Sequence, residues 1–175
     1  MKILEQEERR RTTVESSRNI SYYEIGVYTD LSVMNTVTAD QMNEIIDYWG
    51  AYEFMGYGQT FIDASKQSGL DPVYILAHAA IESGWGTSEI AQTKHNYFGI
   101  GAIDYDPYNC SFVMGDGLSQ GIIEGAIWIA DNYYNVGQTS LYTMRYNGGY
   151  HEYCTSTTWA DNIANIMYVS YSVIQ

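Results

Sequence analysis

The segment GQTFIDASKQSGLDPVYILAHAAIESGWGTSEIA (58–91) predicts two helices in succession. Apolar residues at helical spacing indicate the first helix over residues 59–68, and a glycine follows it. Asp71 and Pro72 then supply an N-cap and a first-turn proline for the second helix. One apolar stripe continues from there to Gly84, where we expect this second helix to end.

Helical periodicity continues on both sides of this segment. Upstream, Thr38 begins a capping box, and apolar residues follow at helical spacing as far as Trp49. Downstream, the pattern predicts helices from Thr87 or Ser88 to Lys94, from Leu118 to about Tyr134, around 139–146, and from about Thr158 onward.

Residues 97–117 interrupt the helical pattern. Glycines and a proline separate two short runs, Phe98–Ile103 and Ser111–Met114, which favour a small β-hairpin. The expected fold class is therefore α+β, mostly helical with a small β-hairpin lobe. We expect one domain over 38–175, preceded by an N-terminal arm or linker over 1–37 that is partly helical.

Charge excludes some classes of partner. The chain of 175 residues has a net charge of −13, and five of its eight basic residues lie in the first 18 positions. An acidic body repels phosphate groups, so we expect no nucleic-acid binding by the main domain and no electrostatic adhesion to an anionic membrane. The 18 tyrosines are typical either of Tyr replacing Phe at half-buried positions or of a carbohydrate-binding cleft, and composition alone favours the first interpretation.

The sequence shows neither a signal-peptide pattern nor an apolar run typical of a membrane-spanning helix. The first residues, MKILEQEERRRTTVESSRN, carry charge where a signal peptide needs an apolar region, so we expect no export by a signal of the chain's own. The best apolar run, 118–130, contains Glu124, so we expect no membrane insertion. Cys110 and Cys154 have no metal-type spacing; they could pair, although free thiols are favoured.

Glu82 is the candidate catalytic residue that the pattern itself singles out. It follows the apolar Ile81 and lies two residues before the glycine that ends its helix. The partial negative charge of a helix C-terminus and burial beside Trp85 would both hold its carboxyl protonated near neutral pH. A protonated carboxyl is what a general acid for glycosidic cleavage requires. The alternative, an inert solvent-facing glutamate, is the commoner case on spacing alone.

Two other kinds of site are disfavoured. His78 precedes Glu82 by four residues, but the chain lacks the H-E-x-x-H pattern of a zinc site, so we expect no metal and a hydrogen-bonding role for His78 behind the cleft. Cys110 and His151 could form a cysteine peptidase pair. Cys110 precedes a predicted strand and has no basic neighbour, which disfavours a reactive thiolate.

With these residues in view, the sequence resembles the peptidoglycan N-acetylglucosaminidases of glycoside hydrolase family 73 over roughly residues 38–171. The segment 58–91, with Glu-Ser-Gly at its centre, carries the strongest similarity. Three later segments are similar to the rest of the family pattern: NYFGIGAIDYDPYN (96–109), GAIWIADNYYNVGQTSLYTMRYN (125–147) and HEYCTSTTWADNIANIM (151–167). The resemblance implies a lysozyme-like fold, with the hairpin lobe beside the catalytic cleft.

The resemblance also implies roles for single residues. Glu82 matches the family's general acid, and Tyr153 matches a tyrosine beside the cleft that would orient the substrate N-acetyl group or a water. Further substrate-binding residues are expected in Trp85 and in the segment that borders the cleft, which contains Asn96, Tyr97 and Asp104.

The second carboxylate matches less well, because residues 97–117 contain no glutamate. Their acids are Asp104, Asp106 and Asp116. We prefer Asp116, at the mouth of the expected hairpin, as base or electrostatic partner. The substrate N-acetyl group can also act as internal nucleophile, without a fixed base.

The expected function is cleavage of the β-1,4 bond between N-acetylglucosamine and N-acetylmuramic acid in peptidoglycan glycan strands, without any metal or organic cofactor. Alternatives are a muramidase or lytic transglycosylase on the same fold, or a non-catalytic wall-binding or structural module. Related autolysins carry export signals and wall-binding modules, and we recognise neither in this sequence. An enzyme without them must be carried or released to reach the wall, so we expect a bacteriophage origin. The favoured form is a virion-associated lysin for a Gram-positive host, bound to phage tail proteins through residues 1–37. An endolysin released at lysis, or a fragment of a longer protein, is the alternative.

Overall fold

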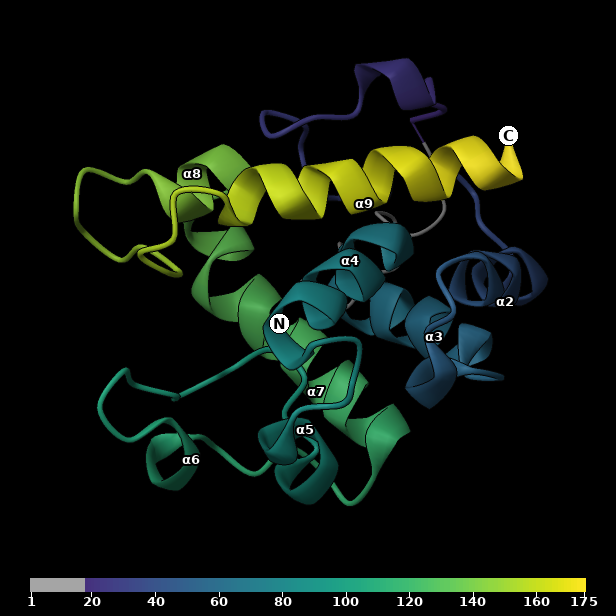
Figure 1. Cartoon of the computed structure of the whole chain (residues 1–175). Helices are drawn as coiled ribbons and strands as arrows, with labels where there is room; N and C mark the ends of the chain where they lie inside the picture. Colours follow the sequence, from purple (N-terminus) through teal and green to yellow (C-terminus); the bar gives the residue numbers. More distant parts are fainter. Residues whose placement is uncertain (1–17) are drawn as a thin grey trace, which may run out of the picture.

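The computed structural model describes residues 18–175, which form a bundle of helices (Figure 1). Its helices are α2 (Ala39–Tyr48), α3 (Gly58–Ser68), α4 (Pro72–Ser83), α5 (Glu89–Lys94), α6 (Pro107–Cys110), α7 (Leu118–Asn132), α8 (Leu141–Arg145) and α9 (Trp159–Ile174), with short 3-10 turns η1 (Tyr22–Glu24), η2 (Tyr52–Phe54) and η3 (Tyr134–Val136). The helices expected from periodicity are confirmed. None of those within the described range has the length and apolar character that crossing a membrane requires.

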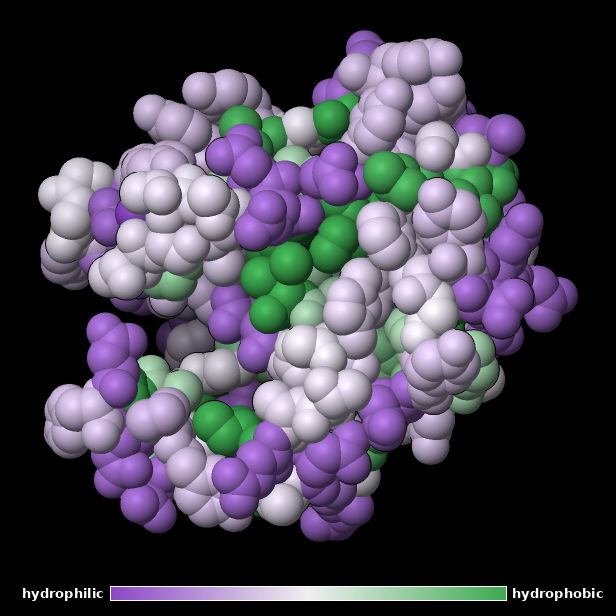
Figure 2. Space-filling model, viewed as in Figure 1, coloured by the Kyte–Doolittle hydropathy of each residue, from purple (hydrophilic) through white to green (hydrophobic). Residues whose placement is uncertain are grey.

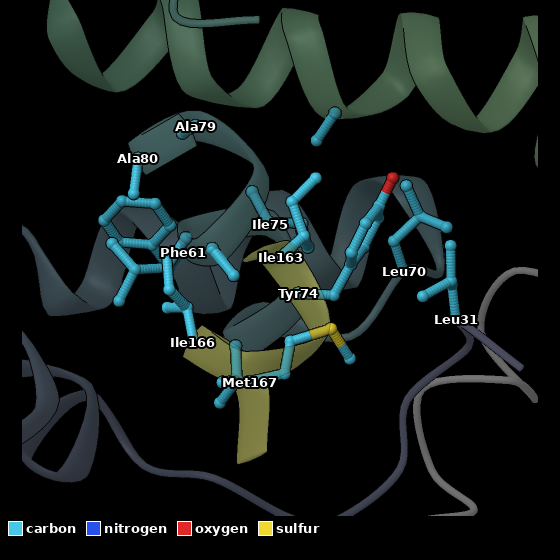
Figure 3. Packing of buried hydrophobic residues seen from close by; sticks show 14 of the residues in the cluster. Leu31, Phe61, Leu70, Tyr74, Ile75, Ala79, Ala80, Ile163, Ile166 and Met167 are labelled. Atoms are coloured by element: carbon cyan, nitrogen blue, oxygen red, sulfur yellow. The ribbon is translucent and has the colours of Figure 1, made fainter. Parts of the chain in front are cut away.

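Helix α4 is the centre of the core. All of its residues except Ile81 and Glu82 are buried, and it packs against α3 on one side and α9 on the other. Figure 3 shows Tyr74 and Ile75 of α4 among Phe61 from α3 and Ile163 from α9. A helix that is apolar all round is stable only when covered in this way, so α4 and its last turn have a fixed position.

One buried carboxylate joins two distant parts of the chain to the start of α4. Asp71 Oδ1 accepts the N-cap hydrogen bonds from the Val73 and Tyr74 amides at 3.0 and 3.2 Å. Its Oδ2 accepts from the Met34 amide at 2.9 Å and from the Tyr171 hydroxyl at 2.6 Å. Burial raises the pKa of Asp71, and these four donors oppose that shift.

Residues 18–37, expected to belong to an arm, lie against the helices. Leu31 and Met34 are buried, and two isolated β-bridges pair Asp30 with Ser140 and Ser32 with Leu70, which lies just before α4. The division of the chain at residue 37 stays a prediction. The helix expected near the N-terminus falls largely in residues 1–17, outside the described residues.

The expected β-hairpin is wrong. Residues 18–175 contain isolated bridges but no strand or sheet, so the described chain is helical rather than α+β. The two runs do meet, through one backbone hydrogen bond from Phe112 to Ile100. The amide side chain of Asn96 binds the carbonyls of both residues and the Ile100 amide, and so occupies groups that a hairpin ladder would use. Between the runs the chain forms α6 instead.

Helix α7 brings the loop after α5 close to α4. Gly121 and Gly125 lie one turn apart on α7, and a Cβ on either would overlap the loop, at His95 and at the Phe98 ring respectively. Because glycine has no side chain, residues 95–98 can pack directly against the backbone of α7 at these two positions. This contact holds the next residue, Gly99, beside the end of α4.

Candidate active site

Glu82 lies in the last turn of α4, which ends at Gly84 in the left-handed conformation with φ of 57°. Its side chain is 20% exposed. Burial raises the pKa of Glu82 to about 7, and a hydrogen bond from Trp159 partly opposes the shift. Glu82 is therefore a carboxylic acid that keeps its proton into the neutral pH range, as a general acid must.

The Trp159 indole decides which oxygen of Glu82 carries that proton. Trp159 is the first residue of α9, and its Nε1–H donates to Glu82 Oε1 at 2.6 Å. Of the two oxygens of a protonated carboxyl, the carbonyl oxygen is the better hydrogen-bond acceptor, so the oxygen bound by the indole is the carbonyl oxygen. The acidic hydrogen therefore lies on Oε2, the oxygen nearer to Gly99.

Tyr153 joins the two sides of the site. Its ring stacks on Trp159, with centroids 5.2 Å apart and planes 17° apart. Its hydroxyl donates to the Phe98 carbonyl at 2.6 Å. Phe98 itself is buried. Tyr153 thus connects the loop before α9 to the loop after α5, and its role in orienting substrate stays a prediction.

Gly99 is the closest part of the second loop to the acid. It has φ of +66°, and a Cβ placed on it would lie 3.1 Å from Glu82 Oε2. Glycine is favoured here both by the left-handed backbone and by the space that the carboxyl occupies. Figure 2 shows the surface hollowed between the part that carries α8 with its following loop and the part that carries α6.

His78 forms the inner wall of the site, one turn before Glu82. It is fully buried, and its Nδ1 lies 2.9 Å from the Tyr74 hydroxyl. Burial lowers the pKa of His78 to about 3, so the imidazole is neutral at the pH values at which Glu82 titrates. The expected hydrogen-bonding role in the wall is therefore present, and His78 Nε2 lies 3.8 Å from Glu82 Oε1.

The other expected substrate-binding residues differ in exposure. Trp85 is half-buried and stacks on Trp49, with centroids 5.3 Å apart, so part of its ring is available three residues after Glu82. Asn96 and Tyr97 are buried. Since the Asn96 amide is used within the loop, these two residues shape the border of the site from behind.

The expected acidic partners are on the surface. Asp104 is exposed in the loop before α6, and Asp116 is exposed just before α7, with its backbone amide bound to Gln120. Asp106 caps α6 through Asn109. Within residues 18–175, no hydrogen bond or ion pair joins any of these aspartates to Glu82. The structure does not bring the two expected carboxylates together by direct contact.

The disfavoured chemistries gain no support. In the described part of the chain, no three His, Cys, Asp or Glu side chains gather as a metal-binding group. Cys110 and Cys154 are both free. His151 stacks on Tyr133, just after α7, and its Nδ1 lies 2.7 Å from Oε1 of Gln138, just after η3, so these contacts do not involve Cys110.

Two residues of the site were missed by sequence reasoning. The sequence predicts the helix that begins near Trp159, but no local signal indicates that the indole reaches Glu82. Gly99 was expected only as a break in the helical pattern. Its position within the segment 96–109 of the family pattern is the single signal that could have marked it.

Comparison with known proteins agrees with this geometry. The family model described as mannosyl-glycoprotein endo-beta-N-acetylglucosaminidase, the glucosaminidase family, matches residues 58–172. A putative endo-beta-N-acetylglucosaminidase of Streptococcus pneumoniae serotype 4 is 32% identical over 143 residues, which are 81% of this chain and 21% of that protein. A bifunctional autolysin of Staphylococcus aureus is 33% identical over 154 residues, covering 75% of this chain and 12% of that protein.

The solved structures agree as well. The crystal structure of S. aureus autolysin E is similar with a TM-score of 0.73 and 27% identity, covering 92% of this chain and 77% of that one. The chain spans about a fifth or less of the length of the two curated relatives. The family match over most of the helical core, including the helix that carries Glu82, shows that this chain belongs to the glucosaminidase family of glycoside hydrolases.

Proposed function

We propose that this protein hydrolyses peptidoglycan at the β-1,4 bond between N-acetylglucosamine and N-acetylmuramic acid, with Glu82 as general acid. The observation that carries the proposal is the environment of Glu82, whose pKa is raised to about 7 by burial and whose Oε1 is fixed by Trp159. Crystal structures of the similar S. aureus autolysin E contain a muropeptide, NAM-L-Ala-D-iGlu, and, in a catalytic glutamate-to-alanine mutant, the disaccharide NAG-NAM. These ligands support peptidoglycan as the substrate here.

The bond breaks by proton transfer from Glu82. Its Oε2 gives the proton to the glycosidic oxygen, the C1–O bond breaks, and the leaving sugar departs with a new hydroxyl. The positive charge that develops at C1 is relieved by the carbonyl oxygen of the substrate N-acetyl group. Water then attacks C1 and returns one proton to the Glu82 carboxylate, which restores the acid. The half-buried Trp85 would offer an apolar surface for a sugar ring, and Tyr153, held by its hydrogen bond to the Phe98 carbonyl, would orient the N-acetyl group.

The function is tested by comparing wild type with Glu82→Gln, which keeps the shape and removes the acidic proton. The wild type should clear purified cell walls, and Glu82→Gln should lose at least about a hundredfold in rate. Glu89→Gln is the matched control, because Glu89 is an exposed glutamate of α5. Equal clearance by wild type and Glu82→Gln would remove Glu82 from the role of general acid, and no clearance by either protein would leave the non-catalytic wall-binding module.

The reducing ends of the digested glycan fragments identify the bond that is cut. A reducing N-acetylglucosamine end supports the proposal. A reducing muramic acid end would assign a muramidase instead, and a 1,6-anhydro end would assign a lytic transglycosylase.

For the second carboxylate we propose Asp116, as base or electrostatic partner, because its exposed side chain lies where the loop that borders the site enters α7. Asp116→Asn should then lose a large part of the activity. Near-normal activity would transfer this role to Asp104, Asp106 or the substrate N-acetyl group, and the same substitution at each aspartate separates these cases.

For the place of action we propose the wall of a Gram-positive host, opened by a phage tail to which residues 1–37 are bound. The distribution of charge is compatible with this idea, because the first 18 residues hold five basic residues against four glutamates and are nearly neutral, so they would not repel an acidic partner as the remainder of the chain would. An antibody against this protein should label purified virions. Detection in late lysates but not in virions would favour an endolysin.

A further inference from the structure

His78 holds a polar atom that the fold leaves unpaired. Its Nε2 is a buried side-chain nitrogen without a hydrogen-bond partner, and no other described side-chain nitrogen or oxygen shares this condition. Leaving such a group unpaired is unfavourable, so unpaired buried atoms are rare and call for an explanation. Glu82 Oε1 lies 3.8 Å from this nitrogen.

The partner of the other ring nitrogen identifies the tautomer. The Tyr74 hydroxyl lies 2.9 Å from His78 Nδ1 and 3.5 Å from Met144 Sδ. An imidazole nitrogen is a much better acceptor than a thioether sulfur, so the hydroxyl donates to Nδ1. The ring proton is then on Nε2, and an N–H group rather than a lone pair faces Glu82.

Packing prevents the ring from turning to another partner. The His78 ring makes edge contacts with Phe98, Tyr153 and Trp159, at centroid distances of 5.5, 4.6 and 5.2 Å. These residues come from the loop after α5, the loop before α9 and α9 itself. Trp159, Tyr153 and Gly99 from the same three elements also lie beside Glu82, so His78 and the acid have the same neighbouring segments.

We propose that His78 is a positioning residue for Glu82. When Glu82 gives up its proton and becomes a carboxylate, the distance of 3.8 Å between Nε2 and Oε1 shortens, and His78 Nε2–H becomes a second hydrogen-bond donor to Oε1. The inference rests on the proposed role of Glu82 as general acid. Two donors on Oε1, from Trp159 and His78, keep the acidic hydrogen on Oε2 before transfer and stabilise the anion after it.

Glu82 is the group near His78 that changes charge in the working pH range. The titratable side chains around the pair are Tyr74 from α4, Tyr133 from the end of α7, and Tyr153 and Cys154 from the loop before α9. Burial raises the pKa of all four, so they stay neutral. The charged pair Arg145–Glu152 lies beyond Cys154.

The test compares His78→Leu, which has no donor, with His78→Gln, whose side-chain amide places an N–H near the position of Nε2. Activity falls at alkaline pH when Glu82 ionises. Loss of a donor to the carboxylate should move this alkaline limb up by about one pH unit in His78→Leu. It should also lower kcat about tenfold at pH 5 with KM unchanged. His78→Gln should keep the limb close to that of wild type. An unchanged limb in His78→Leu, or an equal shift in both variants, would overturn the proposal.

A measurement on the folded wild type removes the risk that a variant misfolds. In ¹⁵N-labelled protein, NMR should show the His78 proton on Nε2 throughout pH 5–8, with a chemical shift that titrates together with Glu82. This titration should disappear in Glu82→Gln. A proton on Nδ1, or an Nε2 shift that does not change, would refute the role of His78. Because this readout needs no turnover, it separates a failure of the His78 proposal from a failure of the proposed function.

Discussion

The indole Nε1 of Trp159 donates a 2.6 Å hydrogen bond to Oε1 of Glu82, across 77 residues of sequence. The bond joins the first turn of α9 to the last turn of α4. Since α9 packs along α4, the position of the acid is set by the packing of these two helices rather than by the loop around it. The bond also lowers the pKa that burial raises, so it tunes the acid as well as holding it.

Trp159→Phe should therefore shift the pH dependence of activity. Phenylalanine keeps a ring against Tyr153 but donates no hydrogen bond, so the pKa of Glu82 rises further. We expect the alkaline limb of kcat/KM to move up by about one pH unit. Trp49→Phe is the matched control, because it also loses an indole hydrogen bond, to Ser170, away from Glu82. Identical pH profiles for Trp159→Phe and wild type would contradict the assignment.

Gly99→Ala should damage activity more than stability. The added methyl group lies 3.1 Å from Glu82 Oε2 and must displace the carboxyl from its position. We expect kcat to fall at least about tenfold, because small displacements of a catalytic group are costly. Gly50→Ala is the control: φ is +62° there, so the backbone strain is similar, but nothing lies within 4 Å. The comparison uses kcat and urea unfolding, and equal activity losses in both variants would exclude crowding of Glu82.

Gly125→Ala should destabilise the protein although alanine is normally the better helix former. The new Cβ overlaps the ring of Phe98, which is buried and cannot move outward. Overpacking of this kind costs about 1–3 kcal/mol. Urea unfolding should show this loss, whereas Gly26→Ala, with nothing within 4 Å of the added atom, should change little. A Gly125→Ala variant as stable as wild type would mean that residues 95–98 do not press on α7.

Glu82→Gln should alter how stability depends on pH. The pKa of Glu82 is about 7 in the folded protein and near its ordinary 4.5 in the unfolded chain. Between these values the unfolded chain ionises first, so wild-type stability falls as pH rises, and the loss is complete above the folded pKa. Glutamine does not titrate. The free energy of unfolding of Glu82→Gln should thus exceed that of wild type by up to about 3 kcal/mol at pH 8.5, and the excess should shrink toward pH 4.5.

Urea unfolding at several pH values measures this difference. Glu89→Gln, at an exposed site on α5, should run parallel to wild type. Parallel curves for Glu82→Gln would show that Glu82 has an ordinary pKa in the folded state.

Residues 97–117 show where local sequence signals mislead. Short apolar runs between glycines are typical of a hairpin, and the two runs do lie side by side. The pairing nevertheless stops at one backbone bond, because the Asn96 side chain, which precedes both runs, has bound the groups that a ladder needs. A sequence pattern indicates which secondary structure a segment prefers. It does not indicate which side chain will compete for the backbone hydrogen bonds of that segment.

The sequence by itself determined the helices, the caps of α4 and the place of Glu82 in its last turn, because periodicity, N-caps and glycine C-caps act over a few neighbouring residues. Only the tertiary structure decided the chemistry of that glutamate. Its desolvation, the Trp159 donor, the unpaired Nε2 of His78 and the close approach of Gly99 all depend on which distant segments meet at the end of α4. Burial and electrostatic contacts depend on how segments that are distant in sequence pack together, and no local sequence pattern encodes them.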